Sequence, residues 1–187
     1  MRRHPIASVT ALLLSLVGCA GSPLKTLPAS AHLPGTANVE AYPVEHLAVR
    51  SLIERFSDAA NHADWKATEE MFTEDAVWEV QAPPPMGWTF TGREAIHQGM
   101  TANLGRVELR VQTVSPTVVH VQGPDRATAR STLDEVLRFK ETGKDVRIVG
   151  TYSDQLVKQA GQWKFARRTF IPRFDEPVAT VTGSARD

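Results

Sequence analysis

Residues 43–81, PVEHLAVRSLIERFSDAANHADWKATEEMFTEDAVWEVQ, set the fold of this chain. Apolar residues recur there at helical spacing and form one stripe, at Val49, Leu52, Ile53, Phe56, Ala59, Ala60 and Ala63. Asp64 is placed to cap a second, shorter helix, and TEDAVWEV then alternates as a strand does. A long amphipathic helix followed so soon by a strand needs a sheet to pack on.

The rest of the chain supplies that sheet. The residues Thr91-Gly92-Arg93-Glu94 have capping-box spacing and predict a third helix that ends near Asn103. Alternating apolar residues then predict four strands, at 106–121 with a bulge or break at Ser115-Pro116, 126–140, 145–158 and 162–171. Short turns join these strands, which indicates an antiparallel meander and an α+β fold.

The N-terminus has the pattern of an export signal. Arg2 and Arg3 precede a short apolar run at residues 11–17, which is too short to span a bilayer. The run ends in Leu16-Val17-Gly18-Cys19, which resembles the lipobox of bacterial lipoproteins, where the cysteine is lipidated. We therefore expect an exported protein anchored by a lipid on Cys19 to the bacterial cell envelope, on its periplasmic face or the cell surface. The alternative is a plain secretory signal with an incidental cysteine.

These features predict four parts in the chain. Residues 1–18 are the expected lipoprotein signal peptide, and residues 19–42, which contain several prolines, are a flexible tether. Residues 43–175 are the expected folded domain, and residues 176–187 are a frayed tail.

The composition excludes several kinds of site. Lys and Arg number 21 and Asp and Glu also number 21, and this neutrality argues against nucleic acid as a partner. A single cysteine excludes an internal disulfide and a cysteine-based zinc site. No histidine has metal-ligand spacing to another His, Asp or Glu, so we predict no metal and no cofactor.

Several motifs follow one another over about residues 44–172: Asp64-Trp65, FTEDAV at 72–77, FTGREAI at 90–96, GTYSDQLV at 150–157, GQWKF at 161–165 and Arg168. Together and in this order they resemble the SnoaL-like branch of the nuclear transport factor 2-like superfamily. The resemblance implies a cone, in which a strongly bent antiparallel sheet wraps round a long N-terminal helix with two shorter helices. Its pocket opens at one end. Family members include polyketide cyclases, scytalone dehydratase, steroid isomerase-like enzymes, a dehydrochlorinase and many proteins with no known reaction.

The resemblance also implies where catalytic groups would lie, and this chain lacks them. Dehydratase-like members have an Asp late in the first helix and a His on the strand after the third helix. Here the first position is Asn61, and the second falls at Val111 or Gln112. Steroid isomerases instead use a Tyr in the first helix and an acid at the end of the first strand, where this chain has Phe56 and Val80. Neither pair is present.

Three other residues are candidates for catalysis. Tyr152 and Asp154 share one face of a central strand, which the resemblance places along the pocket, and His62 lies at the edge of the apolar stripe. A structural role is the alternative for each. Tyr152 would then belong to the core with a bonded hydroxyl, Asp154 would pair with an arginine such as Arg168, and His62 would be a surface residue.

Aromatic and apolar residues provide the walls for a binding site. The candidates are Phe56, Trp65, Phe72, Trp78, Val80, Trp88 and Tyr152. Such walls with few polar groups suit a small hydrophobic molecule, although the same rings could simply fill the core.

Three functions therefore stay open. The first is a binding module without the Asp–His pair. The second is a dehydratase-, isomerase- or cyclase-type enzyme with an unconventional acid–base group. The third is a structural envelope protein that forms a homodimer through its open sheet face.

Overall fold

The computed structural model describes residues 39–82 and 87–177, with the side chains of 110, 116 and 174–177 excepted. All of these residues belong to one compact unit, residues 33–187. The predicted signal peptide, Cys19, most of the tether and most of the tail lie outside the described residues. No helix within the described ranges is long and apolar enough to cross a membrane.

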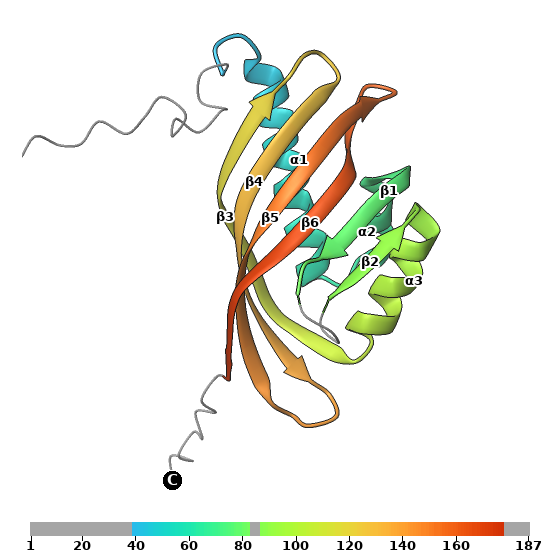
Figure 1. Cartoon of the computed structure of the whole chain (residues 1–187), viewed down its shortest axis with the longest axis vertical. Coiled ribbons are helices and arrows are strands. Elements are labelled where there is room, and N and C mark those ends of the chain that lie inside the picture. Colours follow the sequence, from blue (N-terminus) through green and yellow to red (C-terminus); the bar gives the residue numbers. More distant parts are fainter. Residues whose placement is uncertain (1–38, 83–86, 178–187) are drawn as a thin grey trace, which may run out of the picture. The chain divides into compact units, whose positions relative to one another are not determined.

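The described chain forms three helices and six strands (Figure 1). In chain order they are α1 (Pro43–Asn61), α2 (Trp65–Glu70), β1 (Phe72–Val80), β2 (Trp88–Thr91), α3 (Arg93–Leu104), β3 (Val107–Val121), β4 (Arg126–Phe139), β5 (Asp145–Gln159) and β6 (Gln162–Pro177). The predicted α+β class is confirmed. Strand β6 extends six residues beyond its predicted end at 171 and two beyond the expected domain end at 175.

The six strands form one sheet in the order β2-β1-β6-β5-β4-β3. The neighbours from β3 to β6 are antiparallel, as predicted. Strand β2, which was not predicted, pairs antiparallel with β1, whereas β1 and β6 run parallel. Sequence reasoning missed this pair because it joins the first strand to the last. The whole meander between them supplies the long connection that a parallel pair requires.

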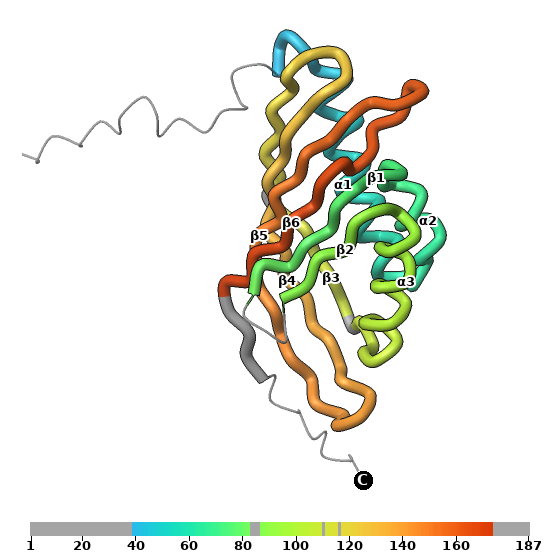
Figure 2. The backbone as a smooth tube through the Cα atoms, turned by 45° about the vertical axis from the view of Figure 1, so that its right-hand side comes forward, coloured from blue at the N-terminus to red at the C-terminus, as the bar shows by residue number. Residues whose placement is uncertain are grey.

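The sheet curves strongly, and the three helices lie on one of its faces (Figure 2). The stripe predicted in α1 faces inward, and Val49, Leu52, Ile53 and Phe56 are almost completely buried. Its last predicted member, Ala63, is instead exposed and lies beyond the end of the helix. Burying this stripe stabilises the helix, because each such side chain contributes about 1.5–3 kcal/mol when it leaves water.

Local chemistry explains how the first two helices meet. Ala63 has a φ of 54°, a left-handed conformation that ends α1 and turns the chain. Asp64 then caps α2 as predicted, since its carboxylate accepts a hydrogen bond of 3.0 Å from the Ala67 N–H. This tight corner places Trp65 just beyond the end of α1, beside the cavity described below.

The start of α3 differs from the prediction. Gly92, and not Thr91, is the N-cap residue, and no side chain caps the helix. Thr91 is still part of β2, where it pairs with Val77, so it is not free to form a capping box. The Glu94 side chain instead accepts a hydrogen bond of 2.7 Å from Gln98.

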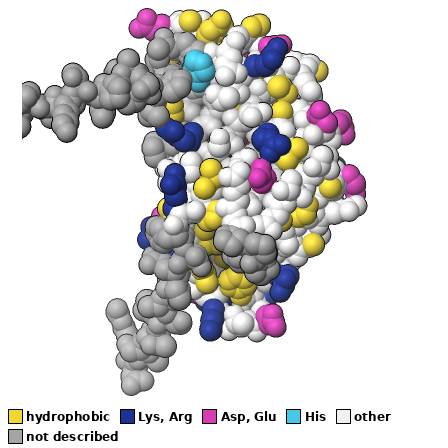
Figure 3. Space-filling model, in the orientation of Figure 1, with side chains coloured by type: hydrophobic (Ala, Val, Ile, Leu, Met, Phe, Trp, Pro, Cys, Tyr) yellow, Lys and Arg dark blue, Asp and Glu magenta, His cyan; other side chains and the backbone are white. Residues whose placement is uncertain are grey.

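Strand β3 contains the irregularity predicted at Ser115-Pro116. Its register against β4 shifts between Val114 and Thr117, and again between Leu109 and Val111, but the strand continues through both places. Bulges of this kind bend a sheet locally, and these two lie in the strand that packs along α1. On the face drawn in Figure 3, charged side chains of both signs lie in small separate groups.

Candidate functional site

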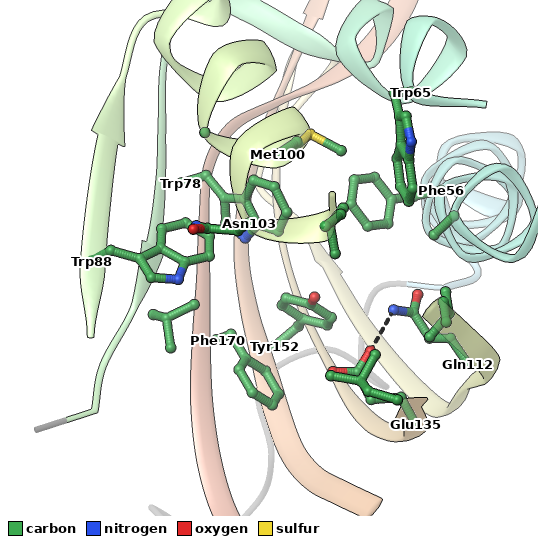
Figure 4. Close-up of a pocket in the computed structure, with 16 residues that line it drawn as sticks. Phe56, Trp65, Trp78, Trp88, Met100, Asn103, Gln112, Glu135, Tyr152 and Phe170 are labelled. Carbon is green, nitrogen blue, oxygen red and sulfur yellow. Dashed lines mark hydrogen bonds between the residues drawn. The ribbon is translucent and has the colours of Figure 1, made fainter. Parts of the chain in front are cut away.

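A cavity of about 120 Å³ lies between the helices and the inner face of the curved sheet. Most of its wall is apolar, and six aromatic side chains contribute to it: Phe56, Trp65, Trp78, Trp88, Tyr152 and Phe170. Its polar wall residues are Asn103, Gln112 and Glu135. Figure 4 shows these side chains converging from α1, α2, α3 and strands β1 to β6.

Six of the seven predicted wall residues line this cavity: Phe56, Trp65, Trp78, Val80, Trp88 and Tyr152. The seventh, Phe72, does not. It is completely buried and packs against Phe56 and Phe165, with ring centroids 6.0 and 5.4 Å apart. The sequence prediction missed Phe170, which does line the cavity. Whether the cavity binds a ligand stays a prediction.

Ring contacts hold the aromatic wall in place. The ring centroid of Trp78 lies 4.9 Å from that of Trp88, with the two rings edge to face. Phe170 lies over β5 at Gly150, where a Cβ atom would come within 2.3 Å of the Phe170 ring. Only glycine at position 150 therefore allows this ring to occupy its place beside the cavity.

Glu135 is the one acidic side chain among the residues that line this cavity. In β4 it stands between the inward-facing Leu133 and Leu137, and it lies opposite Gln112 of β3. The Gln112 Nε2 atom donates a hydrogen bond of 2.9 Å to a Glu135 carboxylate oxygen. Burial raises the pKa of Glu135, and the hydrogen bond from Gln112 opposes that shift only in part.

The sequence contains a weak signal for Glu135. The run Leu133, Glu135, Leu137 follows the two-residue period of a strand, so a charged side chain stands on an apolar face. The adjacent Asp134 makes this pattern ambiguous, because the sequence alone does not show which of the two acidic side chains faces inward. In the structure Asp134 faces the other way and pairs with Arg147 at 2.6 Å.

Tyr152 lies at the centre of the cavity wall, with its hydroxyl directed between Phe56 and Gln112 (Figure 4). Burial raises the pKa of its phenol well above the ordinary value, with smaller opposing effects from Arg168. The hydroxyl is therefore neutral near pH 7. It can share a hydrogen bond or donate a proton, but it cannot serve as a base.

Asp154 does not line the cavity. It and Arg168 are both almost completely buried, with the carboxylate 3.8 Å from the guanidinium Nε, which is the pairing considered above. The Arg168 guanidinium also lies over the rings of Phe56, Tyr152 and Phe165, at 4.1, 3.7 and 4.5 Å from their centroids. Burial raises the pKa of Asp154 to about 6 against the attraction of Arg168. This pair is a structural support behind the wall.

His62 is also far from a catalytic arrangement. Its side chain is about three-quarters exposed, and its Nδ1 atom lies 2.8 Å from the carbonyl oxygen of Asp58 on the surface of α1. It contributes nothing to the cavity wall. Within the described ranges, no group of three His, Cys, Asp or Glu side chains could hold a metal ion.

The two positions where the resemblance implies an Asp–His pair do lie together. The Asn61 amide donates to the Gln112 carbonyl at 2.8 Å and accepts from the Gln112 N–H at 2.7 Å. Both ends of the amide are thus used to fasten the end of α1 to β3. The Gln112 side chain points elsewhere, toward Glu135 (Figure 4).

A second cavity, of about 340 Å³, adjoins the first and shares Ala60, Trp65, Leu104 and Leu109 with it. Glu108 and Lys140 also line this second space. Trp65 lies beside both spaces.

Comparison with known proteins extends this description. The sequence pattern of the SnoaL-like domain family matches residues 45–169. A solved Mycobacterium tuberculosis protein of unknown function is 30% identical, with 72% of this chain and 75% of that chain covered and a TM-score of 0.60. Among curated proteins the comparison found no match.

Two further solved structures have the same fold. A scytalone dehydratase-like protein from Novosphingobium aromaticivorans is 24% identical, with 79% of this chain and 99% of that chain covered and a TM-score of 0.64. A LinA-type3 hexachlorocyclohexane dehydrochlorinase from Novosphingobium barchaimii is 16% identical, with coverages of 73% and 92% and a TM-score of 0.63. At these identities the likeness concerns the fold alone.

Proposed function

The chain belongs to the SnoaL-like domain family, and from this premise we propose that it binds a small, mostly apolar molecule in its aromatic-lined cavity. The single observation that carries the proposal is the cavity itself. Rings from α1, α2, β1, β2, β5 and β6 surround it, and its few polar groups are Asn103, beside Trp78 and Trp88, and the pair Gln112 and Glu135. Apolar walls with few polar groups are typical of small-molecule sites.

The volume limits the size of the ligand. An apolar cavity of about 150 Å³ engineered in another protein holds benzene. At about 120 Å³ this cavity suits a molecule of roughly that size, and the adjoining space can take a substituent. Drug-sized ligands need larger pockets, of about 300–1,000 Å³.

The residues at the family's catalytic positions favour binding over catalysis. Asn61 cannot carry the charge that would stabilise an imidazolium, and its amide is already engaged by the main chain of Gln112. Gln112 cannot accept a proton. A protein with these residues lacks the usual means of removing a proton from a bound molecule.

One observation supports a second candidate function, which is proton transfer by an unconventional acid. Glu135 is a carboxyl group with a raised pKa at the wall of a cavity, which is a common property of catalytic acids and bases. The neutral hydroxyl of Tyr152 could supply a hydrogen bond nearby. An enzyme of this kind would lose turnover in a Glu135→Gln variant while it still bound the substrate.

The proposed location is the bacterial cell envelope. The support for it is the basic leader, the short apolar run and the LVGC motif that ends at Cys19. A lipid on Cys19 would leave the cavity-bearing domain at the end of a tether of about 24 residues, free to meet small molecules outside the cytoplasm.

A pair of matched substitutions tests binding. Ala60→Phe places a ring at a position that lines both spaces, and Ala102→Phe makes the same change on the exposed side of α3. We expect calorimetric titration with a compound such as cyclopentanol to show binding to the parent and to Ala102→Phe, and at least tenfold weaker binding to Ala60→Phe. Equal affinity in all three proteins would place the ligand elsewhere and contradict the proposal.

A further inference from the structure

We infer that the molecule held in this cavity is a small organic ammonium ion, whose nitrogen pairs with Glu135 and whose apolar body lies against the indole rings. This inference rests on the proposed binding function and names the chemical class of the ligand. It is carried by the buried charges, by an unused hydrogen-bond acceptor and by the aromatic walls.

Two acidic side chains but only one basic side chain lie near Tyr152. Asp154 and Arg168 compensate each other behind the wall, at 3.8 Å. Glu135 lies in front of them, and among the residues that the structure describes no Lys, Arg or His side chain pairs with it. When all three groups are ionised, this region carries one net negative charge. A cation in the cavity would compensate that charge.

A second acceptor lies beside the carboxylate. Gln112 is buried, and its Nε2 atom is committed to Glu135. Its Oε1 atom is buried as well and accepts no hydrogen bond from any described residue. An ammonium group that donates one hydrogen to Glu135 and another to Gln112 would satisfy both acceptors. The buried Nε1–H of Trp78 also has no described partner, and it would suit an oxygen elsewhere on the ligand.

The aromatic walls suit the apolar body of the ligand. Trp65, Trp78 and Trp88 all line the cavity. The rings of Phe56 and Tyr152 line it as well, and the Arg168 guanidinium lies over both, at 4.1 and 3.7 Å from their centroids. A cation at such a distance is attracted by the ring quadrupole. The protein interior thus contains one cation held by aromatic rings and a carboxylate, and the cavity offers a carboxylate and aromatic walls to a second.

Three probes of matching shape test this inference. Cyclopentylamine is protonated at pH 7.5, cyclopentanol is neutral with a hydroxyl, and cyclopentanone is a neutral acceptor only. Each is titrated into the full-length chain by calorimetry. We expect the amine to bind at least tenfold more tightly than the alcohol or the ketone, because only the amine compensates Glu135.

Two variants give the matched control. Glu135→Gln keeps the shape of the side chain and removes its charge, whereas Glu141→Gln removes one charge from an exposed turn. We expect Glu135→Gln to weaken amine binding by on the order of thirtyfold, since one partner of a buried charge pair is lost. Its affinity for the alcohol should change less than about twofold, which also shows that the variant is folded. Glu141→Gln should bind all three probes as the parent does.

Proton linkage gives an independent readout. Among the described side chains, those that line the cavity with Glu135 are uncharged. Asp154 and Arg168 lie behind Tyr152, and Glu108 and Lys140 line the adjoining space. Amine affinity should therefore fall as the pH is lowered and Glu135 takes up a proton, whereas alcohol affinity should stay level. The Glu135→Gln variant should lose this pH dependence.

The outcomes separate the inference from the function on which it rests. If the three probes bind equally, or if the Glu135→Gln variant still binds the amine as tightly as the parent does, the inference of an ammonium ligand is wrong. The cavity would then be a site for a neutral ligand. Preferred binding of the ketone would also overturn it, because Glu135 would then act as a protonated hydrogen-bond donor. Binding of none of the probes would overturn the proposed function as well.

Discussion

Glu135 is an acidic residue in the wall of a mostly apolar cavity. A carboxyl group beside a hydrophobic cavity is costly to ionise, and Gln112 offers it only one neutral hydrogen bond. The folded domain therefore holds the Glu135 proton more tightly than the unfolded chain does. By linkage, this group's contribution to stability is complete below the ordinary pKa of 4.5 and is lost as the pH rises through the raised value.

The Glu135→Gln substitution should remove this pH-dependent loss of stability, because glutamine does not ionise. We expect its free energy of unfolding to equal or exceed that of the parent at pH 7.5, and the difference between the two proteins to shrink toward pH 4.5. Denaturant unfolding at a series of pH values measures this. His46, whose pKa is lowered by burial, acts in the opposite direction but equally in both proteins. Parallel curves for parent and variant would show that Glu135 has no raised pKa.

At the residue scale, the sequence indicated which residues come together, but it did not show which way their side chains point. The resemblance pointed to Asn61 and Gln112, and the structure brings these residues together, but by a contact between an amide and a main chain. Glu135 was missed because two adjacent acids, Asp134 and Glu135, fit either phase of the strand. Only the pairing with β3 and β5 decides which of them faces inward.

Elements were more predictable than their pairings. Periodicity located β4 and β5 to within one residue, because burial on one face imposes the pattern directly. The parallel pairing of β1 with β6 and the start of α3 at Gly92 depend on contacts distant in the sequence, and no local pattern encodes them. The course of β6 to Pro177 likewise depends on its partner β5.

The hairpin of β5 and β6 is fastened to α1 through Trp163. The ring is 5% exposed, and its Nε1–H donates a hydrogen bond of 2.6 Å to Glu45, which also binds Lys158 at 3.0 Å. Trp163→Ala should lower the free energy of unfolding by about 3–5 kcal/mol, as truncations of buried aromatic residues do.

Thermal or denaturant unfolding checks this prediction. Trp163→Phe is the control, since it keeps most of the packing and removes only the hydrogen bond, at a cost of about 1–3 kcal/mol. A loss below about 1 kcal/mol in the alanine variant would show that the hairpin is held by other contacts.

At the scale of the whole molecule, the expected lipid anchor should determine where the protein is located but not what it binds. Cys19→Ser removes the thiol that a lipid would modify. We expect the parent to be found in the membrane fraction of a bacterial host and the variant to be soluble or unprocessed. Both should bind the same small molecules, because the cavity lies within residues 56–170. A serine variant that still fractionates with membranes as the parent does would contradict the lipid anchor.

The central claim, that the aromatic-lined cavity binds a small and mostly apolar molecule, can be tested with the chain's own tryptophans. The sequence has four, of which Trp65, Trp78 and Trp88 line the cavity and Trp163 does not. Indole N–H signals can be followed by nuclear magnetic resonance while the tightest-binding cyclopentyl probe is added. The account predicts saturable shifts of the three cavity signals and an unchanged Trp163 signal. Shifts of Trp163 alone, or of none of the four, would contradict it.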